Sequence, residues 1–331
     1  RKNRAERLNK YIDFSRSQQF GKIRDFALNF YSLNFELDAP DISAKERESI
    51  LVQAMLKALA AKNVMLGQGT RFELYLQPKF RFAKNDASPA VVGAEALIRL
   101  FIDDGLGKRQ MVAPDVFLKV GHEAGLTNRI GAWVVEEAIS IAKGWKNSGL
   151  PKDFDLSINI SPVQMALGGF ATDFTERVIA AGVDDVVSVE LIEEWGKDDG
   201  IYVSVANRLH ELSARTRVHI DDFGSGSTKL SYISRTDHLY SIKIDRCLVL
   251  GLGSKGGDKA KKLIDGIVAF AMKNNLHIIA EGVENDEQLG ILKGIGVEDF
   301  QGFHKKLFSA PIPQKDFEAK YLCKKGVEAT L

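Results

Sequence analysis

The sequence predicts an α/β fold, most economically a (β/α)₈ barrel, preceded by a helical segment. Two observations lead to this prediction. Eight short runs of β-forming residues alternate with helical patterns over about 240 residues, which is typical of a sheet with crossover helices. Seven of those runs also carry a polar residue toward their C-terminal side. A doubly wound open sheet is the alternative, because periodicity alone does not separate the two.

The first 70 residues differ from the rest. Residues 1–12 hold five basic side chains against one Glu, so we interpret them as a solvated linker, with a partner helix or membrane-surface arm as alternatives. The aromatic-rich stretch 15–33 is predicted to be helical. The capping-box sequence Ser43-Ala-Lys-Glu46, followed by apolar residues at helical spacing, predicts a helix over 43–62. The chain begins without Met, so we expect a piece of a longer protein, with any sensor segment upstream.

From residue 71 onward, strands and helices are expected to alternate. The predicted strands are 72–78, 91–97, 154–160, 186–191, 217–222, 240–245, 277–281 and 297–303. The predicted helices are 114–124, 128–146, 168–181, 200–214, 258–274 and 285–293. We therefore expect three parts: an N-terminal helical segment or linker over 1–70, an α/β domain over 71–320 and a C-terminal tail over 321–331.

The composition is that of a soluble globular protein, with 331 residues, 45% hydrophobic and 27% charged. Lys and Arg number 45 against 44 Asp and Glu, a balance that argues against DNA, RNA or anionic membranes bound through bulk charge. No apolar run of about 18 residues occurs, so no membrane span is expected. Cys247 and Cys323 are far apart and in no metal-ligand spacing, which favours a reducing, cytoplasmic setting. The alternative is the cytoplasmic part of a longer, membrane-attached protein.

The polar residues near the strand ends are the strongest functional signal. They are Glu95, Asn159, Glu190, the Asp221–Asp222 pair, Lys243, Glu281 and Gln301. In a parallel barrel all C-terminal strand ends lie on one face, where active sites are found. Carboxylates converging there would repel one another by several kcal/mol, so we expect a cation to neutralise them. The alternative is that each residue caps a helix or lies in a surface loop. One such case is common, but seven strands in succession make this coincidence improbable.

The donor set indicates which cation this is. The candidate ligands are carboxylate and amide oxygens, with no His or Cys at a strand end, which favours Mg²⁺ or Mn²⁺ over zinc. The adjacent carboxylates of Asp221 and Asp222 suit a pair of metals, the usual arrangement for in-line attack on a phosphodiester. Lys243 would either orient or deprotonate the attacking water or form an ion pair with the aspartates. The residues therefore predict a two-metal hydrolase of a phosphate ester.

The same segments resemble the motifs of the EAL domain family, bacterial phosphodiesterases that cleave cyclic di-GMP. The matching segments are Tyr75-Leu-Gln77-Pro78, Glu95-Ala-Leu97-Ile-Arg99, Ser157-Ile-Asn159-Ile-Ser161, Glu190-Leu-Ile-Glu193, Asp221-Asp222-Phe223-Gly224-Ser-Gly226, Ile242-Lys243-Ile-Asp245, Ala280-Glu281-Gly282-Val283-Glu284 and Gln301-Gly302-Phe303. A lone Glu-Ala-Leu would mean little, but the further motifs follow in order. The resemblance covers roughly residues 71–320.

The resemblance implies a TIM-like barrel whose first strand is antiparallel to the others. It implies two Mg²⁺ or Mn²⁺ ions held by Glu95, Asn159, Glu190, Asp221, Asp222 and Glu281. It implies catalysis by Lys243, Glu281 and Glu95, with substrate bound by Gln77, Leu97, Arg99 and Gln301. Glu193 would anchor the loop that follows the double aspartate. The implied product is linear pGpG, the partners are a second copy of the chain and an upstream sensory or GGDEF domain, and the role is second-messenger control of biofilm and motility.

Three departures from the family pattern stand out. Ile192 replaces a usual Thr, Ser227 stands where a Tyr is usual, and residues 304–306 form an insertion of about three residues. None removes a proposed metal ligand. Two other functions compete with hydrolysis: a non-catalytic cyclic di-GMP receptor that signals through residues 1–70, and a partner-binding regulator that uses the barrel as a scaffold. The complete ligand set from Glu95 to Glu281 favours the enzyme.

Overall fold

The computed structural model describes residues 43–61, 69–82, 88–103, 109–151, 153–191, 199–224, 239–253, 257–304 and 309–322. The strands are β1 (Arg71–Arg81), β2 (Ala90–Asp103), β3 (Arg109–Val112), β4 (Asp155–Ile160), β5 (Val187–Leu191), β6 (Val218–Phe223), β7 (Ser241–Ile244), β8 (His277–Val283), β9 (Asp299–Gly302) and β10 (Ile312–Pro313). The helices are α3 (Ala44–Ala60), α4 (Pro114–Glu123), α5 (Thr127–Asn147), α6 (Pro162–Met165), α7 (Phe170–Ala181), α8 (Asp199–Ser213), α9 (Arg246–Gly251), α10 (Gly257–Lys273), α11 (Asp286–Ile295) and α12 (Gln314–Phe317), with a π-helical turn over Glu318–Leu322.

Eight of these strands close into a barrel within the described residues. They are hydrogen-bonded in the order β1-β9-β8-β7-β6-β5-β4-β2, and β1 pairs in turn with β2. All neighbours from β2 to β9 along this order are parallel, whereas β1 is antiparallel to β9, with Phe80 opposite Phe300. The predicted barrel with an antiparallel first strand is therefore confirmed, and the doubly wound alternative is excluded.

Each predicted strand forms, but the structure adds elements that the sequence patterns did not predict. The strands β3 and β10 and the helices α6, α9 and α12 are new, and each is six residues long or shorter. Segments this short contain too few residues to show a periodic pattern. The helix predicted over 15–33 lies outside the described residues. Among the described helices, none is both long and apolar enough to cross a membrane.

The chain divides into two compact units, which are described separately. One unit contains the described residues up to Glu73 together with Ile98–Ile130. In it, α3 begins with the predicted capping box, in which Glu46 accepts a hydrogen bond from the backbone of Ser43 at 2.9 Å. Helix α3 packs on α4, and the rings of Phe72 and Phe117 lie 5.8 Å apart.

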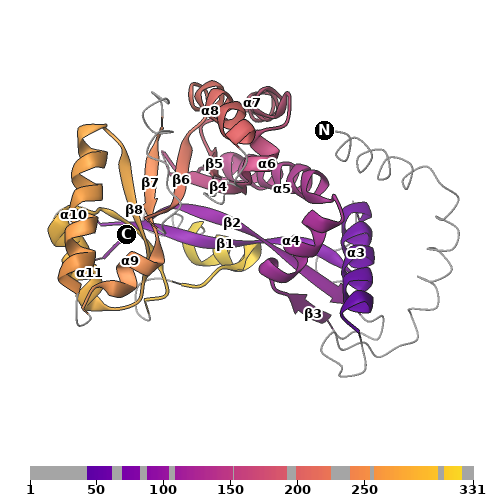
Figure 1. Ribbon diagram of the computed structural model, residues 1–331, viewed down its shortest axis with the longest axis horizontal. Coiled ribbons are helices and arrows are strands. Elements are labelled where there is room, and N and C mark those ends of the chain that lie inside the picture. The colour runs from indigo at the N-terminus through magenta and orange to yellow at the C-terminus, as the bar shows by residue number, and fades with distance from the viewer. Residues whose placement is uncertain are drawn as a thin grey trace, which may run out of the picture. The chain divides into compact units, whose positions relative to one another are not determined.

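The other unit contains Leu74–Leu97 and the chain from Gly131 onward, and it includes the barrel. Its strands β4, β5 and β7 alternate between apolar and polar side chains. On β4, for example, Leu156 and Ile158 are fully buried on one face, and Ser157 and Asn159 lie on the other. Figure 1 shows the covering helices, with α9, α10 and α11 beside β7 and β8. The apolar residues therefore pack against helices, and the polar residues line the barrel interior.

Candidate active site

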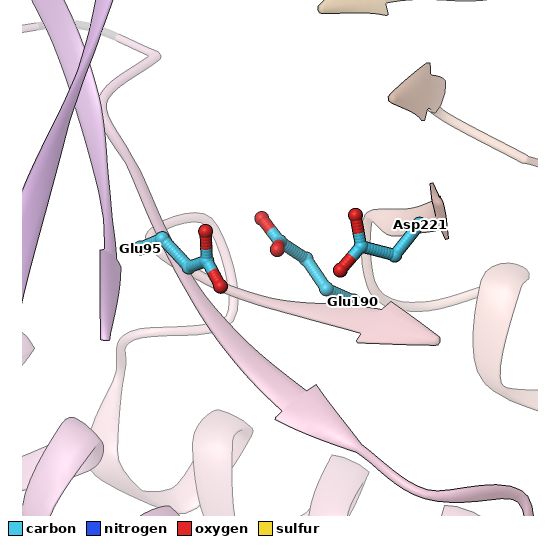
Figure 2. Close-up of side chains that lie close together, drawn as sticks. All are labelled: Glu95, Glu190 and Asp221. Atoms are coloured by element: carbon cyan, nitrogen blue, oxygen red, sulfur yellow. The ribbon is translucent and has the colours of Figure 1, made fainter. Parts of the chain in front are cut away.

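Carboxylates from different strands converge inside the barrel. Oxygens of Glu95 on β2, Glu190 on β5 and Asp221 on β6 lie within 4.8 Å of one another, and all three residues are buried (Figure 2). A second group, Asp221, Asp222 and Glu281, meets the same distance limit and shares Asp221 with the first. The structure thus brings together the carboxylates that the sequence placed at successive strand ends.

An irregular backbone turns two adjacent aspartates toward the same place. Successive side chains of a regular strand point to opposite faces. Asp222, however, has φ +52°, and the pairing of β6 with β7 is irregular between Ile220 and Phe223. Aspartate is one of the few residue types that tolerate this left-handed conformation. The bulge therefore allows both Asp221 and Asp222 to contribute to one site.

Lys243 lies at the centre of the carboxylates. Its Nζ atom is 2.5 Å from Glu190, 2.6 Å from Glu281, 2.9 Å from Asp221 and 3.4 Å from Glu95. Burial alone would lower the pKa of Lys243, but the surrounding carboxylates outweigh it and hold this pKa well above its ordinary value. The ion pair that the sequence suggested between Lys243 and the aspartates is therefore present with Asp221.

The amide side chains support Glu95. Asn159 donates a hydrogen bond to Glu95 Oε1 at 2.6 Å, and Gln301 donates one to Glu95 Oε2 at 2.6 Å. Gln301 also donates to Gln77 at 3.1 Å. Gln77 and Gln301, expected to bind substrate, are both buried and both belong to this hydrogen-bonded group.

The crowding of carboxylates is visible in their pKa values. Burial, with the charges of Glu190 and Asp221, raises the pKa of Glu95. Burial, followed by the Asp221 and Glu95 charges, raises the pKa of Glu281 well above its ordinary value, even though Lys243 acts in the opposite direction. Groups perturbed in this way favour protonation or a bound cation.

The residues fit the predicted cations. Every ligand atom that the two groups offer is an oxygen, the donor type that Mg²⁺ and Mn²⁺ prefer. The amide oxygen of Asn159 would complete the set, once its side chain turns from the orientation that donates to Glu95. The shared Asp221 suits two ions side by side.

Two site residues were given no role in the sequence analysis, although Asp245 ends one of the motifs quoted there. Asp245 follows β7, caps α9 by accepting the Cys247 N–H at 2.7 Å, and shares a hydrogen bond with Asp222. Burial, the Asp221 charge and this contact raise the pKa of Asp222 to about 7. The second missed residue is Lys79, which reaches Glu190 from β1 with an Nζ–Oε1 distance of 2.8 Å.

Leu97 and Arg99 are the other described residues that were expected to bind substrate. Leu97 and Arg99 are half-buried, and the Arg99 guanidinium donates to the carbonyl of Ile98 at 3.0 Å. Arg99 belongs to the unit that does not contain the barrel. Glu193, Ile192 and Ser227 lie outside the described residues, as does most of the 304–306 insertion.

Fold and site together define a closed α/β barrel with an acidic site suited to hard divalent cations. A family model described as the EAL domain matches residues 57–306. The chain belongs to the EAL domain family.

Two curated relatives and one solved structure illustrate this membership. The signaling protein YkoW of Bacillus subtilis is 32% identical over 262 residues, which cover 76% of this chain and 29% of YkoW. The cyclic di-GMP phosphodiesterase PdeR of Escherichia coli is 29% identical over 250 residues, 75% of this chain and 35% of PdeR. The structure of the PaMucR phosphodiesterase in complex with c-di-GMP superposes with a TM-score of 0.67 at 28% identity, covering 81% of this chain and 99% of that one. The chain spans about a third of the length of the curated relatives.

Proposed function

We propose that this chain hydrolyses cyclic di-GMP to linear pGpG with the help of two divalent cations, Mg²⁺ or Mn²⁺. The observation that supports this most strongly is the pair of three-carboxylate groups sharing Asp221. Glu95, Asn159, Glu190 and Asp221 would hold one ion, and Asp221, Asp222 and Glu281 the other. Two similar proteins support the choice of substrate. PdeR is named a cyclic di-GMP phosphodiesterase, and the PaMucR phosphodiesterase was solved in complex with c-di-GMP.

The charge of the site supports two cations. Five carboxylates make up the two groups, Lys243 supplies one positive charge among them, and the charge of Lys79 beside Glu190 is balanced by Asp155. The negative charge that remains is close to what two divalent ions carry. Burying unneutralised carboxylates together is costly, so bound cations would relieve a repulsion that the fold itself creates.

The chain's own groups would then guide the reaction. When bound, the two cations would activate the attacking water and stabilise the charge that develops on the phosphate. We assign Lys243 to orient that water, because its ammonium reaches oxygens of both carboxylate groups. Water adds to phosphorus, the phosphorus bond to the 3′ oxygen breaks, and the proton released by water ends on that oxygen. Opening one ring bond in this way yields pGpG.

The finer assignments follow the family resemblance. We assign substrate contacts to Gln77, Leu97, Arg99 and Gln301, with Gln301 also holding Glu95 in place. We assign Glu193 as the anchor of the loop after Asp222. A homodimer, an upstream sensory or GGDEF domain and a cytoplasmic location complete the proposal.

The test compares two Glu→Gln variants in a pGpG assay by chromatography. Glu95→Gln removes a carboxylate of the first group while keeping its shape, so we expect the rate to fall by at least about 100-fold, more than loss of an outer partner costs. The matched control is Glu136→Gln on α5, whose side chain is 59% exposed, and it should keep the wild-type rate. Equal rates in both variants would contradict the proposal.

The receptor alternative has a distinct outcome in the same experiment. A receptor would bind cyclic di-GMP in calorimetry but release no pGpG at any Mg²⁺ or Mn²⁺ concentration. That result would overturn the enzyme proposal and favour a binding role for the same barrel.

A further inference from the structure

A second buried lysine lies inside the barrel, beside the carboxylate groups. Lys79 on β1 is 2% exposed, and its Nζ atom contacts three side chains. These are Ser157 at 2.7 Å, Glu190 at 2.8 Å and Asp155 at 2.9 Å. A charged group so completely buried needs strong partners, and Lys79 has two carboxylates.

Glu190 is consequently held at both of its oxygens. Lys79 donates to Oε1, and Lys243 contacts Oε2 at 2.5 Å. Glu190 itself is fully buried. The two lysines differ in their other partners, because the carboxylates around Lys243 are all candidate cation ligands, whereas Lys79 is also paired with Asp155, which is not.

Asp155 holds Lys79 on the side away from the site. His219 Nε2 lies 3.3 Å from Asp155 Oδ2, and Arg217 Nε lies 3.6 Å from Oδ1. His219 is fixed in turn by hydrogen bonds with Ser241 at 2.6 Å and Ser188 at 3.0 Å. Small serine side chains on three strands leave the interior volume that Lys79 and His219 fill. The ammonium of Lys79 is therefore anchored independently of the cation site.

We propose that Lys79 is a positioning residue that fixes Oε1 of Glu190 and thereby presents Oε2 to the cation. The inference rests on the proposed function, in which Glu190 is a cation ligand. It extends that function, since Lys79 would act through Glu190 without touching substrate or cation. Outer partners of metal-binding carboxylates typically affect metal affinity by 10–100-fold.

A positioning role and a purely electrostatic role for Lys79 predict opposite changes in cation affinity when the lysine is removed. Removing a positive charge near a cation site would, by Coulomb's law alone, tighten cation binding. Removing a positioning contact would loosen it, because Glu190 would then have to be ordered at the expense of binding. The sign of the change in affinity therefore distinguishes the two.

The test measures Mn²⁺ affinity by titration calorimetry, at a temperature well below the Tm of each variant. We expect Lys79→Met to weaken Mn²⁺ binding by about 10–100-fold. The matched control is Arg81→Met on the same strand, which breaks an ion pair with Asp299 and touches neither carboxylate group. It should leave the affinity within about 3-fold of wild type. Should Lys79→Met fail to fold, the double variant Lys79→Met with Asp155→Asn also removes the carboxylate that loses its lysine partner. Its Mn²⁺ affinity then tests the positioning role.

An affinity that is unchanged or tighter in the Lys79 variants overturns the positioning role. If the wild type binds Mn²⁺ but forms no pGpG, the proposed hydrolysis is overturned, and the Mn²⁺ affinities of the Lys79 variants still test the positioning role. Wild-type protein that binds no Mn²⁺ overturns both.

Discussion

At the scale of residues, the site is a set of acids held closer together than their charges favour. Asp222 illustrates the consequence. Burial and the neighbouring Asp221 and Asp245 raise its pKa to about 7, from about 4 in an unfolded chain. Its protonated form is thus favoured by the folded state, and the ionised form destabilises that state. The proposed role of Asp222 as a cation ligand would explain why the fold carries this cost in stability.

This cost predicts that Asp222→Asn is more stable than wild type in the presence of EDTA, by an amount that depends on pH. Between about pH 4 and pH 7 the folded wild type binds more protons than the unfolded chain, so its stability falls as pH rises. The variant, uncharged throughout, should melt at a higher Tm than wild type by pH 8, with a difference that grows from pH 4 to 7 and is then constant. Asparagine also tolerates the positive φ of this position.

Thermal melts at several pH values provide the measurement, with and without Mn²⁺. Adding Mn²⁺ should raise the Tm of wild type more than that of the variant, because the variant lacks one carboxylate of the second group. A variant that melts below wild type in EDTA at pH 8 would contradict the account.

The site carboxylates could be predicted from the sequence because each stands at the end of an expected strand. Lys79 could not, since the strand was predicted to end at Pro78, whereas β1 continues to Arg81. Because β1 is antiparallel, its C-terminal end also lies at the opposite end of the barrel from the others. Asp245 was quoted in a motif but given no role, because a helix-capping aspartate after a strand is ordinary.

At the scale of elements, two irregular strands direct carboxylates into the barrel. Strand β6 does so at Asp222, and β8 does so at Glu281, where the pairing with β9 shifts between Ala280 and Val283. Gly282 follows with φ +67°, a conformation that glycine adopts without strain. A Cβ atom at this position would collide with the Arg246 side chain on α9. These bulges could not be predicted from alternation, which assumes a regular strand.

Gly282→Ala is therefore expected to lower the free energy of unfolding by about 2 kcal/mol or more, from backbone strain and collision. It should also reduce pGpG formation, because Glu281 would lose its orientation. Urea denaturation measures the first effect and the chromatographic assay the second.

A matched glycine provides the control for this prediction. Gly266 lies within α10, where a Cβ atom would meet no other atom within 4 Å. Gly266→Ala should raise the free energy of unfolding by about 0.5–1 kcal/mol, because alanine favours a helix. Equal effects at the two positions would rule out a special role for the β8 bulge.

At the scale of the whole molecule, the order of strands and helices predicted an α/β fold and left a doubly wound sheet open beside the barrel, and the alternation within strands such as β5 explains why the sheet closes. On β5, Val187 and Val189 face helices, while Ser188 and Glu190 face the interior. An open sheet covered by helices on both faces would need apolar residues on both. The division into two units, by contrast, has no signal in the sequence, because β1 and β2 pass through both.

The packing of the C-terminal segment also has no signal in the sequence. Trp145 on α5 stacks on Phe317 with ring centroids 5.6 Å apart and donates a hydrogen bond to Glu318 at 2.8 Å. This contact joins residues more than 170 positions apart, so no local sequence pattern could predict it. Short helices such as α12 are stabilised by packing of this kind more than by propensity.

The central claim is that the barrel binds two cations in order to hydrolyse cyclic di-GMP. The rate of pGpG formation as a function of Mn²⁺ concentration tests it most directly. We predict no product in EDTA and a sigmoidal rise with Mn²⁺, because both carboxylate groups must be filled before water attacks. Product formed at full rate in EDTA, or no product at any Mn²⁺ concentration while cyclic di-GMP stays bound, would contradict the claim.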